Sequence, residues 1–164
     1  MKNSETFEVL TPTDTELVMT RLFDATPELV FDALTKPEYI KQWMIGPEGW
    51  SMTECEFDVR VGGKFRLVWR DQDGKEWVVG GKYTEIDPPG LIVHTEFFND
   101  DEASGGSVET DTIVAEGDKT RLTMTMVYPS KEICQQMIES GMAEGNRVCF
   151  DRMEEIFGES AAVA

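Results

Sequence analysis

The sequence contains little of what a metal centre or a disulfide framework needs. Its 164 residues include one histidine, His94, and three cysteines, Cys55, Cys134 and Cys149. The cysteines form no C-x-x-C pair, and no H-E-x-x-H motif is present. We therefore expect no metal site and no cofactor. The odd number of cysteines favours reduced thiols in a cytoplasmic setting.

Long apolar runs and positive charge are also scarce. No stretch approaches the ~18 uninterrupted apolar residues that a membrane span needs, and the first residues lack the apolar core of a signal peptide. The chain carries 15 basic and 32 acidic residues, for a net charge of −17. Such a field repels phosphate backbones and anionic lipids, so we expect neither nucleic acid nor a membrane as a partner.

Alternating apolar and polar residues dominate the region from 51 to 128. Phe65 and Trp69, for example, lie on one face of a segment whose other face is polar. Turn-forming clusters such as Val61-Gly62-Gly63-Lys64 and Asp87-Pro88-Pro89-Gly90 separate segments of this kind. This pattern predicts an antiparallel meander of about six strands.

Helical signals flank the meander. Thr26-Pro27-Glu28 combines a capping threonine, a first-turn proline and an acidic residue, which predicts a helix start, and Pro37 begins a second short helix. An apolar stripe predicts a long C-terminal helix over 130–157, with Gly141 and Gly145 favouring a kink in it.

This order of elements predicts an α+β fold, in which a strongly curved antiparallel sheet wraps around the C-terminal helix. We expect a single domain over residues 16–158, preceded by an arm at 1–15 and followed by a frayed tail at 159–164.

Five segments carry a resemblance to known proteins: Arg21–Leu34, Pro37–Trp43, Asp58–Phe65, Gly81–Ile86 and Thr120–Thr125. In this order they resemble the START-like (SRPBCC) helix-grip proteins, and more narrowly the branch homologous to the activator of the heat-shock-protein-ninety ATPase. The resemblance implies about seven strands gripping the C-terminal helix, with two short helices closing one end. It also implies a cavity for small, largely apolar molecules.

Large residues on the inferred inward faces are the candidate lining of such a cavity. Together with two polar residues, the candidate ligand-binding set is Trp43, Phe65, Trp69, Trp77, His94, Glu96, Met126, Met142 and Cys149. Flexible methionines suit varied ligands, although ordinary core packing is the alternative for each apolar member. We expect a single-domain protein, monomeric or homodimeric, that binds a hydrophobic or aromatic small molecule.

Two other function classes stay open. His94 and Glu96 share a strand face about 6–7 Å apart, close enough to act as general acid and base in a cyclase- or hydrolase-type enzyme. No nucleophile elbow, oxyanion motif or phosphate loop supports catalysis, so an enzyme is the less favoured prediction. The third class is an acidic protein-interaction or co-chaperone-like module.

Overall fold

The computed structural model describes residues 2–104 and 106–163. Its strands form one antiparallel sheet in the order β1-β2-β8-β7-β6-β5-β4-β3. Their bounds are β1 (Glu8–Leu10), β2 (Glu16–Phe23), β3 (Ser51–Phe57), β4 (Lys64–Arg70), β5 (Glu76–Asp87), β6 (Leu91–Phe98), β7 (Ser107–Glu116) and β8 (Lys119–Val127). The predicted α+β class is confirmed.

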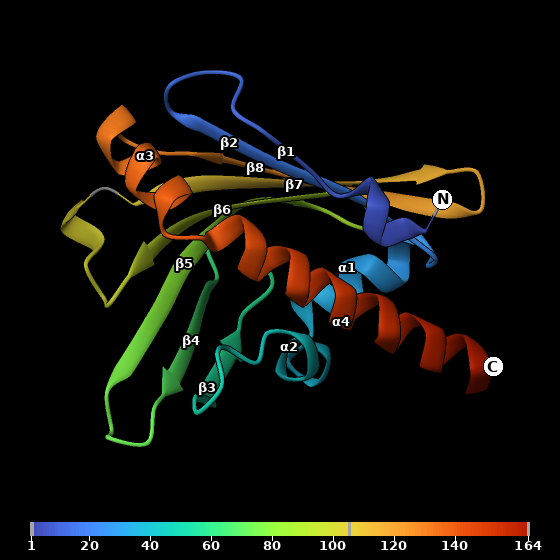
Figure 1. Cartoon of the computed structure of the whole chain (residues 1–164), viewed down its shortest axis with the longest axis horizontal. Helices are drawn as coiled ribbons and strands as arrows, with labels where there is room; N and C mark the ends of the chain where they lie inside the picture. Colours follow the sequence, from blue (N-terminus) through green and yellow to red (C-terminus); the bar gives the residue numbers. More distant parts are fainter. Residues whose placement is uncertain (1, 105, 164) are drawn as a thin grey trace.

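Four α-helices accompany the sheet in the described part of the chain. They are α1 (Pro27–Thr35), α2 (Pro37–Trp43), α3 (Lys131–Glu139) and α4 (Met142–Val163), and short 3₁₀ turns lie at Asn3–Thr6 and Glu102–Ser104. The sheet bends, and α4 lies in the angle between its two halves, with α1 and α2 on the same side (Figure 1). None of the helices in residues 2–104 and 106–163 combines the length and apolarity that crossing a bilayer requires.

The predicted helix starts form as expected. The Thr26 hydroxyl accepts a hydrogen bond from the Leu29 amide at 3.2 Å, and Pro27 occupies the first turn of α1. The Ser130 hydroxyl accepts one from the Ile133 amide at 3.2 Å and so caps α3. These side chains satisfy amides that have no partner within the first helical turn.

Three expected boundaries differ from the structure. The arm contributes β1, which pairs with β2 and raises the strand number from about seven to eight. The single helix expected over 130–157 is two helices, because Gly141 has φ +81°, a conformation that ends α3. Helix α4 then continues to Val163, so the expected tail is helical from 159 to 163, whereas Met1 and Ala164 lie outside the described residues.

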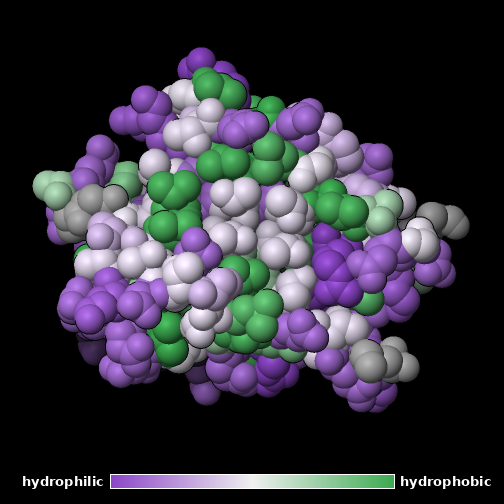
Figure 2. Space-filling view, turned by 90° about the horizontal axis from the view of Figure 1, so that it is seen from above, coloured by the Kyte–Doolittle hydropathy of each residue, from purple (hydrophilic) through white to green (hydrophobic). Residues whose placement is uncertain are grey.

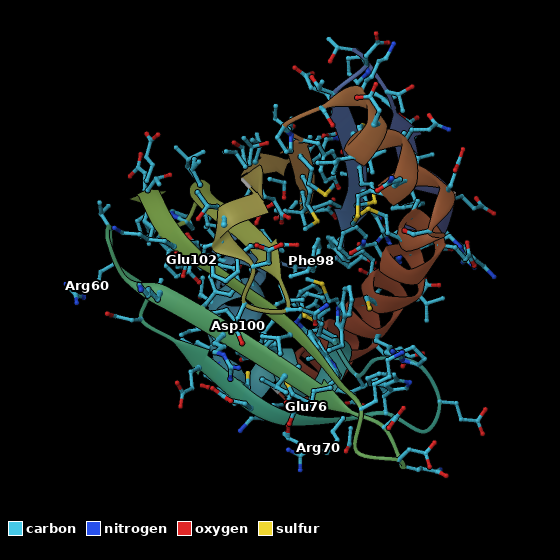
Figure 3. The ribbon with its side chains drawn as sticks, turned by 90° about the vertical axis from the view of Figure 1, so that its left-hand side faces the viewer. Arg60, Arg70, Glu76, Phe98, Asp100 and Glu102 are labelled. Carbon is cyan, nitrogen blue, oxygen red and sulfur yellow. The ribbon has the colours of Figure 1, made fainter. Side chains whose placement is uncertain are left out.

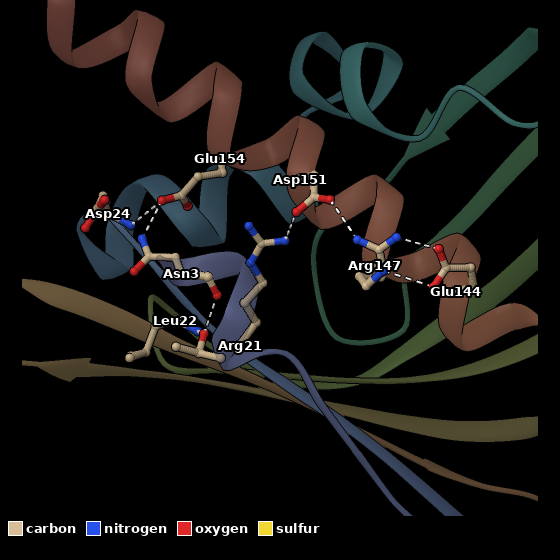
Figure 4. A network of polar contacts seen from close by, with 9 residues as sticks. Asn3, Arg21, Leu22, Asp24, Glu144, Arg147, Asp151 and Glu154 are labelled. Atoms are coloured by element: carbon tan, nitrogen blue, oxygen red, sulfur yellow. Dashed lines mark hydrogen bonds and ion pairs between the residues drawn. The ribbon is translucent and has the colours of Figure 1, made fainter. Parts of the chain in front are cut away.

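A buried arginine fixes α4 against the sheet. Arg21 on β2 is 1% exposed, and its Nη1 lies 2.6 Å from Asp151 Oδ1 on α4. Asp151 also forms an ion pair with Arg147 on the same helix. Further along α4, Glu154 accepts a hydrogen bond from Asn3 in the N-terminal turn (Figure 4). A buried guanidinium needs a carboxylate partner, so this contact sets the position of α4 along the sheet.

The outer face of the sheet carries exposed valines among its polar residues. Val108 on β7 pairs directly with Val127 on β8, and both are exposed, as is Val114. Pale and green residues mix with charged ones on this face (Figure 2). The inner face instead carries the main core, to which α1, α2 and α4 contribute.

The two glycines in the turn between β3 and β4 should differ in how much stability the protein loses when each is replaced by alanine. Gly62 has φ +85° with open space around it, whereas a Cβ on Gly63 would lie 1.9 Å from the Asp58 carbonyl oxygen. Gly62→Ala should therefore cost about 1 kcal/mol through backbone strain alone. Gly63→Ala should cost about 2–3 kcal/mol, because backbone must move.

Urea unfolding of both variants measures this difference, with an unchanged m-value confirming that the same transition is compared. Equal losses at the two positions, or a larger loss at Gly62, would contradict the close approach at Gly63.

Candidate functional site

A cavity of about 330 Å³ lies between the inner face of the sheet and helices α2 and α4. All nine residues predicted as a ligand-binding set border it: Trp43, Phe65, Trp69, Trp77, His94, Glu96, Met126, Met142 and Cys149. The structure thus brings the predicted residues together around one space.

Tryptophans anchored by their indole N–H groups form part of the wall. Trp43 donates to the Ala33 carbonyl oxygen at 2.8 Å, and Trp69 donates to the Met44 carbonyl oxygen at 3.0 Å. Because these polar groups are satisfied by backbone, the ring faces can border an apolar space. The same bonds fix α1 and the end of α2 relative to the cavity.

Trp77 and Phe98 differ from the other aromatic residues because they lie at the exposed margin. Their rings stack at 5.2 Å, and Trp77 is 42% exposed. In Figure 3 Phe98 lies on the inner side of the sheet, whereas Arg60 and Arg70 point outward. This aromatic pair forms the edge of the cavity at the β5–β6 end.

The histidine and the carboxyl groups of the lining come from two adjacent strands. The register pairs His94 on β6 directly with Glu109 on β7, while Glu96 and Asp111 lie two residues further along their own strands, on opposite sides of this pair. All four border the cavity. His94 is 8%, Glu109 6% and Asp111 4% exposed, so the sheet presents buried ionisable groups to the cavity.

His94 is held in a defined orientation. Its Nδ1 lies 3.0 Å from the Thr95 carbonyl oxygen, and its Nε2 lies 3.6 Å from Glu109 Oε1. The Phe65 ring packs edge to face against the imidazole with centroids 5.0 Å apart. The backbone contact assigns the proton to Nδ1 and directs Nε2 toward the carboxylates.

Burial and mutual charge shift the pKa values within this group. Burial alone would lower the pKa of His94, but the contact with Glu109 and the charges of Asp111 and Glu96 raise it to about 10. Burial, reinforced by the charge of Glu109, raises the pKa of Glu96 to about 8. Burial likewise raises the pKa of Asp111, whereas His94 holds the pKa of Glu109 below its usual range despite burial.

Glu109 and Asp111 are absent from the residues predicted from the sequence, where they were only part of the alternating region from 51 to 128. Alternation alone places both on the same face as the buried Ile113, while Val108 and Val114 point outward. This inverted pattern, with acids inside and valines outside, was the available signal.

The shifted pKa values predict that stability falls in alkaline solution. Between the ordinary pKa of His94, 6.5, and its folded-state pKa of about 10, the folded protein holds a proton that the unfolded chain has lost. The free energy of unfolding should therefore fall by about 1 kcal/mol per pH unit across this window. The titration of Glu96 also lowers the free energy of unfolding as the pH rises from 4.5 to about 8, because its folded-state pKa is raised as well.

Urea unfolding from pH 6.5 to pH 10 in the presence of EDTA measures this slope, with His94→Gln as the comparison. The variant should show a flatter dependence above pH 9, where Glu96, with a pKa of about 8, has largely lost its proton. The same slope in both proteins would show that His94 does not carry the effect.

Comparison with known proteins identifies the family of this chain. A model of the Activator of Hsp90 ATPase homolog 1-like protein family matches residues 24–158. A solved structure from Rhodobacter sphaeroides is 26% identical with a TM-score of 0.84, covering 93% of this chain and 98% of that chain.

Two further solved structures share the fold. A protein from Mycobacterium smegmatis has a TM-score of 0.80 at 23% identity, covering 93% of this chain and 98% of its own. One from Nitrosomonas europaea has a TM-score of 0.79 at 22% identity, covering 93% of this chain and 99% of its own. Among curated proteins, no significant match to the sequence was found. On the family match over residues 24–158 and these structural neighbours, the chain belongs to the Activator of Hsp90 ATPase homolog 1-like family of the START-like helix-grip superfamily.

Proposed function

We propose that this domain binds one hydrophobic or aromatic small molecule in the cavity between the sheet and α4. The observation that carries the proposal is a space of about 330 Å³ with aromatic and methionine walls, whose histidine and carboxyl groups all come from β6 and β7. This volume lies at the lower end of the range typical of small-molecule sites.

The cavity is large and reaches the surface of the protein. Trp77, which borders it, is 42% exposed, so solvent and small molecules can enter at this margin. A space of this size with largely apolar walls favours a ligand that displaces weakly held water.

The composition of the walls favours an adaptable apolar ligand with a polar group. Met124, Met126, Met137 and Met142 border the cavity, and their flexible thioethers can follow different ring shapes. On the polar side, His94 and its neighbouring carboxyls offer hydrogen-bonding groups at a buried surface.

Blocking the cavity from α4 tests the proposal. Met142 borders the cavity, and its Sδ receives the Tyr128 hydroxyl at 3.4 Å. Met142→Trp should lower the affinity for a hydrophobic fluorescent dye by about tenfold or more, because the larger ring occupies the ligand volume. Aromatic competitors should displace the dye from the unmodified protein.

Val148→Trp is the matched control, since Val148 is exposed on the same helix and does not border the cavity. It should leave dye affinity unchanged, and both variants should unfold cooperatively. Unchanged dye affinity in folded Met142→Trp would refute binding at this site.

A further inference from the structure

The polar side of the cavity has the geometry of a metal site. One ligand atom each from His94, Glu96 and Glu109 lies within 4.8 Å of the others. Two of these residues come from β6 and one from β7, on the face that borders the cavity. The three side chains therefore converge through strand pairing, not through a short sequence motif.

The distance between His94 and Glu109 leaves room for an ion between them. Their Nε2 and Oε1 atoms are 3.6 Å apart. A charge-assisted hydrogen bond is shorter, about 2.7–2.9 Å. Two ligands at about 2.1 Å from a tetrahedral ion are about 3.4 Å apart.

The orientation of His94 is the one that metal-binding histidines adopt. Its Nδ1 contacts the Thr95 carbonyl oxygen at 3.0 Å, which leaves Nε2 facing Glu109. Backbone carbonyls commonly fix the tautomer and ring plane of a metal ligand in this way.

Asp111 supplies an independent observation. It is 4% exposed and borders the cavity, yet its Oδ1 is buried without a hydrogen-bond partner among the described residues. Its carboxyl interacts with that of Glu109. An unpaired buried carboxyl oxygen beside the carboxyl of Glu109 is costly unless a cation compensates it.

We propose that His94, Glu96 and Glu109 bind a divalent first-row transition-metal ion, with Asp111 as the positioning residue for Glu109. The imidazole nitrogen favours an ion such as Zn²⁺ over Mg²⁺ or Ca²⁺, which prefer oxygen ligands alone. Three protein ligands leave a coordination position for water or a ligand atom from the cavity. The inference does not depend on the proposed binding of an apolar molecule.

The single histidine makes the test direct. Protein labelled with ¹⁵N-histidine gives two imidazole nitrogen signals, both from His94. When chelator-treated protein is titrated with Zn²⁺, the Nε2 signal should shift to the position of a metal-bound nitrogen and saturate at one ion per chain. The Nδ1 signal should remain that of a protonated nitrogen.

Calorimetric Zn²⁺ titration of variants tests the other ligands. Glu109→Gln and Glu96→Gln should each weaken binding on the order of 100-fold, and Asp111→Asn about tenfold, as expected for removing a ligand or its positioning partner. Glu85→Gln removes an exposed carboxylate on the neighbouring β5 and should leave the affinity unchanged. Circular dichroism of each variant verifies folding, and the labelled wild-type experiment decides the question if a variant does not fold.

Cobalt distinguishes this site from binding at thiols. Co²⁺ should give ligand-field bands without a thiolate-to-cobalt charge-transfer band. An unshifted His94 Nε2 signal at saturating Zn²⁺, a strong thiolate band, or equal affinity in folded Glu109→Gln and Glu85→Gln variants would each overturn the proposal.

Discussion

The pairing of β6 with β7 places a histidine opposite a glutamate on the buried face of the sheet, and the rest of the site depends on this register. His94 and Glu109 are both less than one-tenth exposed, with Glu96 and Asp111 adjacent to them. Buried ionisable groups cannot be packed against apolar side chains without losing their hydration. Buried ionisable side chains on β6 and β7 therefore favour an adjoining space that holds water, an ion or a ligand.

The other end of the fold supplies stability. There Arg21 is paired with Asp151, and the rings of Phe23, Phe150 and Phe157 pack edge to face between β2 and α4. These contacts fix the helix over one half of the bent sheet. Toward the other half, α4 begins after the Gly141 break, and its first turns border the cavity. The domain thus combines a tightly packed end with an open one.

Much of this architecture could be predicted from the sequence because its signals are local. The Thr26 cap and the Gly62-Gly63 turn are read from neighbouring residues, and period-two alternation assigned the inward faces that border the cavity. The extent of α4 was missed, since its last turns carry no strong apolar stripe.

The carboxyls on β7 could not be identified as site residues from local sequence signals. Glu109 and Asp111 look like ordinary surface acids in a chain of net charge −17, and only the pairing with β6 brings them to His94. The expectation of no metal site rested on missing short motifs, and potential ligand atoms brought together from two strands form no such motif.

We propose that the His94–Glu109 pair serves a ligand and is not needed for folding. The most direct test is the free energy of unfolding of the double variant His94→Phe/Glu109→Met, measured in urea with EDTA present. Replacing a buried charged pair by apolar side chains of similar volume is commonly neutral or stabilising by about 1–4 kcal/mol. We expect the double variant to be at least as stable as the wild type. A clear loss of stability, or loss of cooperative unfolding, would contradict this proposal and show the pair to be structural.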